Sequence, residues 1–128
     1  MAEILLIDDN QPLRELIAEA LAGAGHVVTQ AGDGRAGISQ LRSGTYAVVI
    51  CDMIMPVADG AEVMAALRGR QPRPRLVMIS GGGSIEPMRY LQMARVLGAD
   101  EVMQKPFPPS KLIDLVERLL AQPQAAQG

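Results

Sequence analysis

Several residue types are scarce in this 128-residue chain, and each scarcity excludes a class of protein. Cys51 is the only cysteine, so no intrachain disulfide can form and a reducing compartment is expected. His26 is the only histidine, so a zinc site with its usual set of cysteine and histidine ligands is excluded. Aromatic residues make up only 2% of the chain, so aliphatic residues and methionine must fill the core.

Long apolar segments and a basic surface charge are also missing. No apolar run approaches the roughly 20 residues needed to span a bilayer. The N-terminal segment MAEILLIDD becomes acidic too early for a signal peptide. A net charge of −2 gives no electrostatic reason to expect nucleic-acid binding, which usually needs a basic face. The sequence therefore predicts a cytoplasmic domain that neither enters a membrane nor binds nucleic acid.

The chain does contain an alternation of short apolar runs and longer segments of helical period. We expect strands at residues 3–8, 27–31, 47–51, 75–80 and 101–105. We expect helices at residues 12–24, 33–42, 59–68, 86–97 and 110–122. Continuous apolar runs are typical of parallel strands covered on both faces, and successive strand–helix units imply right-handed crossovers. The pattern predicts one α/β domain at residues 1–122, with a flexible tail or linker stub at residues 123–128.

Polar side chains gather where the predicted strands end. Asp8 and Asp9 end the first strand, Asp52 the third and Ser80 the fourth, and the fifth runs into Lys105. In such a sheet, ligands bind at the carboxyl ends of the strands. Two carboxylates about 4 Å apart repel by around 4 kcal/mol at an effective dielectric constant near 20, so the cluster requires a cation. Oxygen ligands suit Mg²⁺, and a lysine suits a phosphate oxygen. These parts fit in-line phosphoryl transfer to a carboxylate.

Four motifs at strand ends carry a resemblance to a known family. Each motif alone is weak, but the four occur in order over roughly residues 4–120. They are Asp8-Asp9, then D-x-x-M-P-x-x-D-G at residues 52–60, then Ser80-Gly81, then Lys105-Pro106-Phe107. The chain resembles the receiver domain of bacterial two-component response regulators. The resemblance implies a flavodoxin-like fold with a doubly wound, five-stranded parallel sheet in the order 2-1-3-4-5.

The resemblance also implies a phosphorelay function. Asp52 matches the residue that accepts a phosphoryl group from the phosphohistidine of a sensor histidine kinase or a histidine phosphotransfer protein. Asp8, Asp9, Asp52 and the backbone carbonyl of Ile54 match the Mg²⁺ ligands. Such a domain is a signalling module rather than an enzyme, because it catalyses only its own phosphoryl transfer and slow autodephosphorylation.

Two further positions match groups that respond to the phosphoryl group. Ser80 matches the switch hydroxyl that moves onto a phosphoryl oxygen. Lys105 matches the phosphate-binding ammonium, and the Lys105–Pro106 peptide is expected to be cis. The resemblance places the output surface on the fourth helix, the fifth strand and the fifth helix, and it leaves a homodimer open.

The sequence departs from the family pattern at Val102, where many receivers carry a mobile aromatic residue. Valine has no ring to move, so the usual coupling between hydroxyl and output surface is in doubt. Tyr90 on the predicted fourth helix is one substitute. Ordering of the loop at Gly81-Gly82-Gly83 after phosphorylation is another.

Two other functions are alternatives to a phospho-accepting receiver. A degenerate receiver would act as a binding module without phosphorylation. An aspartyl-phosphate hydrolase of the haloacid dehalogenase kind needs an acid two residues after the nucleophile, and Ile54 occupies that position. No output domain is recognisable, so the chain is either a stand-alone receiver or part of a longer regulator.

Other polar residues receive structural interpretations. Asp59 is expected to cap the third helix, and Cys51 to be an inert buried thiol. His26 is expected to be a solvated loop residue on the edge opposite the acids. The arginines of the RGRQPRPRL segment are interpreted as a solvated loop rather than a docking surface; they are Arg68, Arg70, Arg73 and Arg75.

Overall fold

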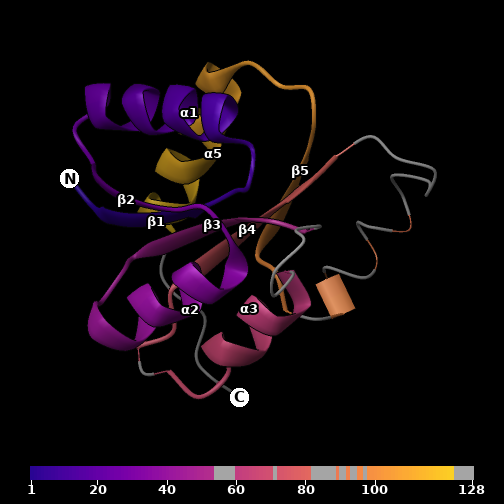
Figure 1. Ribbon diagram of the computed structural model, residues 1–128. Coiled ribbons are helices and arrows are strands. Elements are labelled where there is room, and N and C mark those ends of the chain that lie inside the picture. The colour runs from indigo at the N-terminus through magenta and orange to yellow at the C-terminus, as the bar shows by residue number, and fades with distance from the viewer. Residues whose placement is uncertain are drawn as a thin grey trace.

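The computed structural model describes residues 1–53, 60–70, 72–81, 89, 92, 95–96 and 98–122. Its elements follow the predicted alternation of strands and helices (Figure 1). The strands are β1 (Glu3–Ile7), β2 (Val27–Ala31), β3 (Val48–Asp52), β4 (Arg75–Ser80) and β5 (Glu101–Gln104). The helices are α1 (Gln11–Gly23), α2 (Gly34–Ser43), α3 (Gly60–Leu67) and α5 (Pro109–Ala121). Within the predicted helix at residues 86–97, the described residues 89, 92, 95 and 96 are helical. The predicted tail at residues 123–128 lies outside the described part.

The five strands form one parallel sheet in the order β2-β1-β3-β4-β5, which confirms the predicted fold class. Figure 1 shows α1 and α5 on one face of the sheet and α2 and α3 on the other. The predicted boundaries of these nine elements differ from the observed ones by at most one residue, which is within the usual uncertainty at fraying ends. No helix of the described residues is both long and apolar enough to cross a bilayer.

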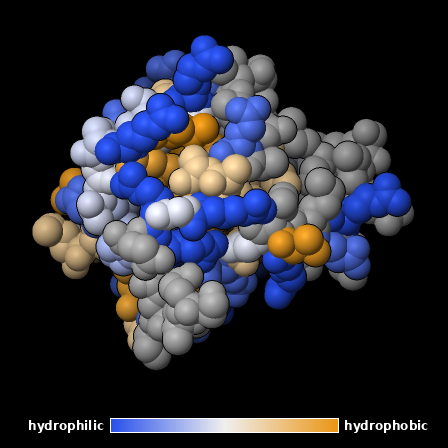
Figure 2. Space-filling view, turned by 90° about the horizontal axis from the view of Figure 1, so that it is seen from below, coloured by the Kyte–Doolittle hydropathy of each residue, from blue (hydrophilic) through white to orange (hydrophobic). Residues whose placement is uncertain are grey.

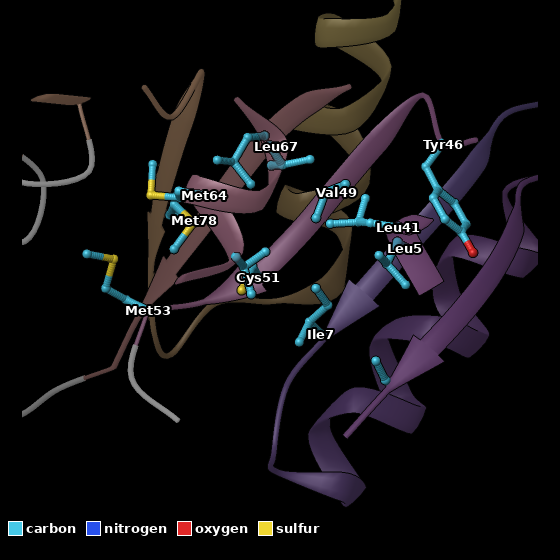
Figure 3. Packing of buried hydrophobic residues seen from close by; sticks show 13 residues of the cluster. Leu5, Ile7, Leu41, Tyr46, Val49, Cys51, Met53, Met64, Leu67 and Met78 are labelled. Carbon is cyan, nitrogen blue, oxygen red and sulfur yellow. The ribbon is translucent and has the colours of Figure 1, made fainter. Parts of the chain in front are cut away.

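The core consists of two layers, because successive residues of a strand point to opposite faces of the sheet. Val48 and Ile50 of β3 pack with α1 and α5, while Val49 and Cys51 pack with α2 and α3. Figure 3 shows the second layer, in which Met64 and Leu67 of α3 pack near the side chains of β3 and β4. Cys51 is buried, as predicted, and forms no disulfide. Both faces of β3 are therefore sealed, which holds Asp52 at the end of a rigid element.

One polar cap and one glycine help to position the helices against the sheet. Asn10 caps α1, since its Oδ1 accepts a hydrogen bond from the Leu13 N–H (3.2 Å). Gly37 lets α2 approach β1, because a Cβ at this position would lie 2.4 Å from Ile7 Cδ1. Seen from the side of α2 and α3, the surface carries many hydrophilic side chains, as expected for the outer faces of amphipathic helices (Figure 2).

The interpretation of His26 as a solvated loop residue is wrong. The side chain lies on the edge opposite the acids, as predicted, but the residue is only 7% exposed. Its Nδ1 accepts a hydrogen bond from the Ala2 N–H (3.2 Å), so Nε2 carries the proton and donates to Glu117 Oε1 (2.7 Å). The ring is therefore a structural connection between the start of β1 and helix α5.

The solvated-loop interpretation also fails for three of the four arginines. Arg70 Nη2 donates to the Gly44 carbonyl (2.8 Å). Arg73 donates to the Gly98 carbonyl, and its Nη1 lies 3.7 Å from Asp100 Oδ2. Arg75 donates through Nη1 to the Leu119 carbonyl (2.5 Å) and through Nη2 to the Gln122 carbonyl, both at the C-terminal end of α5. Each of these three cations therefore donates to a backbone carbonyl of another segment of the chain.

Candidate functional site

The strand register brings the predicted site residues to one edge of the sheet. Ile7 pairs with Cys51, so Asp8 and Asp52 are the next residues on adjacent strands. Asp52 in turn pairs with Ile79 of β4. Ser80 pairs with Gln104 of β5, and the Lys105 N–H donates to the Ser80 carbonyl (2.8 Å). The sheet alone therefore accounts for the meeting of side chains that are far apart in the sequence.

Three carboxylates form a cluster at this edge. Asp8, Asp9 and Asp52 each offer an oxygen within 4.8 Å of the others. Asp8 and Asp52 are 0% and 5% exposed, whereas Asp9 is exposed. Asp8 Oδ1 accepts a hydrogen bond from the Asn10 N–H (2.9 Å), but the buried Oδ2 accepts none from the described residues. Buried carboxylates in this arrangement repel one another and need positive charge nearby.

Lys105 supplies part of that charge. Its Nζ donates to Asp52 Oδ2 (3.0 Å) and lies 3.2 Å from Asp8 Oδ2, close enough for an ion pair. Burial of the ammonium acts to lower its pKa, but the hydrogen bond and the negative charge of Asp52, with the charge of Asp8, outweigh burial. The pKa of Lys105 is therefore raised above its ordinary value of 10.5.

The remaining negative charge fits a hard divalent cation. One ammonium among three carboxylates leaves an excess of negative charge, and Asp8 Oδ2 is a buried acceptor without a hydrogen bond from the described residues. Mg²⁺ prefers carboxylate oxygens, and it usually keeps several waters, which the exposed position of Asp9 allows. The donor set therefore suits Mg²⁺ better than a zinc ion with nitrogen and sulfur ligands.

The backbone beside Asp52 requires a glycine at position 60. A Cβ there would lie 3.1 Å from the Asp52 carbonyl oxygen and 3.0 Å from Met53 Cα. The Gly60 N–H also donates to the Met53 carbonyl (3.1 Å), and this hydrogen bond joins the start of α3 to the end of β3. Of the other residues in this motif, Ile54 and Asp59 lie outside the described residues, so their predicted roles stay predictions.

The remaining predicted positions lie where the sheet requires. Ser80 is 4% exposed at the end of β4, and the Lys105–Pro106 peptide is cis as predicted. Val102 pairs with Met78 and packs, partly buried, against the core layer beneath α2 and α3. Tyr90, Gly82 and Gly83 lie outside the described residues, so neither suggested substitute for the aromatic residue is tested.

Sequence reasoning missed one contributor to this edge. The sequence indicated no residue of β2 at this edge, but Gln30 of β2 accepts a hydrogen bond from Arg14 Nε (3.1 Å). Arg14 Nη1 donates to the backbone carbonyl of Asp8 (2.9 Å). No local signal in the sequence indicates this contact, because it depends on how the first turns of α1 pack beside the carboxyl end of β2.

Comparison with known proteins identifies relatives that share this architecture. Residues 4–117 match the family model described as the response regulator receiver domain. The transcriptional regulatory protein HprR of Escherichia coli is 32% identical over 120 residues, which cover 94% of this chain and 52% of that protein. TcrA of Mycobacterium tuberculosis is 33% identical over 118 residues, covering 92% and 44% respectively. The chain thus spans about half the length of these curated relatives.

Solved structures give the same result. The chemotaxis protein CheY4 of Vibrio cholerae is 30% identical with a TM-score of 0.81, and the match covers 93% of this chain and 98% of that one. The receiver domain of NtrX from Brucella abortus is 28% identical with a TM-score of 0.81, covering 91% and 97%. Because the family model matches most of the chain, the chain belongs to the receiver domains of two-component response regulators.

Proposed function

We propose that this chain accepts a phosphoryl group on Asp52 in a Mg²⁺-dependent reaction. The donor is the phosphohistidine of a sensor histidine kinase or a histidine phosphotransfer protein. The observation that supports this most strongly is the contact of Lys105 Nζ with both Asp52 Oδ2 (3.0 Å) and Asp8 Oδ2 (3.2 Å) inside a cluster of three carboxylates. A carboxylate held this way is an oriented nucleophile beside a cation that can bind the incoming phosphoryl group.

In the proposed reaction, an Asp52 carboxylate oxygen attacks phosphorus in line with the bond from phosphorus to the donor's imidazole nitrogen. The new bond joins oxygen to phosphorus, the phosphorus–nitrogen bond breaks, and its electron pair remains on the imidazole. Lys105 turns from the Asp52 carboxylate to a phosphoryl oxygen and neutralises charge there. Ser80 donates a hydrogen bond to another phosphoryl oxygen.

The acids hold the cofactor in this proposal. Asp8, Asp9, Asp52 and the Ile54 carbonyl would bind Mg²⁺, which supplies charge neutralisation at the phosphoryl oxygens. The electrostatic requirement is large, because a dianionic phosphoryl group must approach three carboxylates. Lys105 alone cannot offset that repulsion.

The biological setting follows from the family. We infer a cytoplasmic module at residues 1–122, with residues 123–128 as a tail or linker. Its output surface would include β5 and α5, with pairing of two copies through that face as one mode. The curated relatives extend beyond the matched region, so an attached output domain is one setting and a stand-alone receiver the other.

One experiment tests the proposal against the degenerate-receiver alternative, which the valine at position 102 favours. The wild-type chain and an Asp52→Asn variant are incubated with a small-molecule phosphodonor and Mg²⁺, and incorporation is followed by intact-protein mass spectrometry. Wild type should gain one phosphoryl group, and Asp52→Asn should gain none. Asp114→Asn, on the exposed face of α5, is the control and should match wild type. An unmodified wild type would favour the degenerate receiver.

A further inference from the structure

Arg14 makes a connection that the phosphoryl-transfer roles do not use. Its guanidinium joins two elements, since Nη1 donates to the Asp8 carbonyl (2.9 Å) and Nε donates to Gln30 Oε1 on β2 (3.1 Å). The guanidinium packs close to the backbone of Gly32, where a Cβ atom would lie only 3.3 Å from Nη1. A planar group with a rigid fork of donors can hold both acceptors at once, whereas an ammonium cannot reproduce that geometry.

The Asp8 carbonyl is the group that decides where Asp9 lies. It belongs to the peptide plane that joins Asp8 to Asp9, so a hydrogen bond to this oxygen sets the orientation of the plane. The preceding N–H is also fixed, because Asp8 N donates to the Ala31 carbonyl (3.1 Å). Asp8 Oδ1 accepts from the Asn10 N–H (2.9 Å). Removal of Arg14 would take away the hydrogen bond to the Asp8 carbonyl, while the hydrogen bonds of the Asp8 N–H and side chain would remain.

Asp9 depends on this support more than its two neighbours do. Asp8 and Asp52 are buried, and both contact Lys105. Asp9 is exposed, and within the described residues its side chain makes no hydrogen bond or ion pair, although it offers an oxygen to the acid cluster. Its place in the cluster is therefore fixed mainly through its backbone, which begins at the peptide that Arg14 holds.

We propose that Arg14 is a positioning residue for the metal site, acting through the Asp8–Asp9 peptide with Gln30 as its brace. This inference rests on the proposed Mg²⁺ site and names a residue that improves it without touching the cation. Groups that orient metal ligands typically change metal affinity by about 10- to 100-fold when they are mutated.

The charge of Arg14 and its hydrogen bonds predict opposite effects of its removal on Mg²⁺ affinity. A binding measurement therefore tests the proposal. A positive charge next to a cation site weakens cation binding, so loss of the charge alone would tighten Mg²⁺ binding. Loss of the orientation of the Asp8–Asp9 peptide would instead weaken Mg²⁺ binding. A residue that only stabilises the fold would leave the Mg²⁺ affinity of the folded protein unchanged.

The test is Mg²⁺ binding by isothermal titration calorimetry on folded protein, with Mg²⁺ alone as the probe. Arg14→Ala should raise the Kd for Mg²⁺ about tenfold. Arg14→Lys keeps the charge and should fall between wild type and Arg14→Ala. Gln30→Ala removes the brace at an exposed position and should give a smaller rise. Arg35→Ala, an exposed arginine on α2, is the matched control and should match wild type.

A second measurement separates positioning from damage to the reaction itself. The Mg²⁺ concentration that half-saturates the phosphorylation rate should increase in Arg14→Ala, while the rate at saturating Mg²⁺ should return close to that of wild type. A Kd equal to or below that of wild type would overturn the proposal. If Arg14→Ala does not fold, an unchanged Kd in Gln30→Ala would overturn it instead. Failure of wild type to bind Mg²⁺ would contradict the proposed function itself.

Discussion

The carboxyl and amino edges of the sheet both carry polar and charged side chains, but they differ in whether the protein itself supplies the partners of those groups. At the carboxyl edge, three carboxylates lie within 4.8 Å, and the buried Asp8 Oδ2 accepts no hydrogen bond from the described residues. At the amino edge, both ring nitrogens of His26 have partners, and Arg75 donates to two carbonyls at the end of α5. The amino edge is thus satisfied by the protein itself, whereas the carboxyl edge needs further positive charge.

This difference indicates how the domain separates stability from function. A satisfied polar edge fixes the end of α5 against the start of the strands and contributes to folding. A cluster of like charges costs folding energy, and proteins accept such local conflicts at functional sites. Substitutions at the amino edge should therefore change stability and leave phosphorylation intact. Substitutions at the carboxyl edge should impair phosphorylation, and those that remove a carboxylate should not lower the stability of the metal-free protein.

Apart from loss of Asp52 itself, the largest effect is expected from Lys105→Ala. Without the ammonium that contacts Asp52 and Asp8, nothing among the described side chains neutralises the phosphoryl oxygens. The phosphorylation rate at saturating Mg²⁺ should fall by about a hundredfold, as is typical when one preorganised donor is removed. The rate is measured with a small-molecule phosphodonor, and Lys111→Ala on the exposed face of α5 provides the control. A rate equal to that of wild type would remove Lys105 from the mechanism.

Arg75→Ala tests the amino edge. This change leaves the Leu119 and Gln122 carbonyls without the guanidinium and should lower the free energy of unfolding by about 2 kcal/mol. Urea denaturation measures the free energy, and the phosphorylation rate of the folded variant should stay at the wild-type value. A large loss of rate with little loss of stability would show that the two edges are not separated in this way.

The smallest effect is expected from Asp9→Asn, and it is a change in the stability of the protein. Loss of one exposed carboxylate relieves repulsion, so in a chelator the variant should be more stable than wild type by about 0.5 kcal/mol at low salt. In Mg²⁺ the order should reverse, because wild type gains more from the bound cation. Thermal unfolding with and without Mg²⁺ measures both cases. A variant less stable than wild type in chelator would contradict the account of repulsion.

Residues whose partners follow from strand order could be predicted from the sequence. The ends of β1, β3 and β4 are visible as the last residues of apolar runs, and a parallel sheet brings such ends together. The sequence therefore predicts that Asp8, Asp52 and Lys105 meet at one edge, and the structure shows their contacts. The cap at Asn10 depends on a hydrogen bond three residues away and was equally visible.

Residues whose partners depend on helix packing could not be predicted. His26 meets Glu117 across 91 residues, and Arg75 meets Leu119 across 44. Both contacts depend on where α5 crosses the sheet edge, which no local pattern in the sequence encodes. The contact of Arg14 with Gln30 depends in the same way on the packing of α1 beside β2.

The most direct test of the account is to locate the phosphoryl group. After reaction of wild type with a phosphodonor, reduction by borohydride converts an acyl phosphate to a stable alcohol, which tandem mass spectrometry can assign to one residue. The account predicts modification at Asp52, dependent on Mg²⁺ and abolished by chelator. Modification at another residue, or equal modification of Asp52 in chelator, would contradict the claim that the acidic edge uses a divalent cation to phosphorylate Asp52.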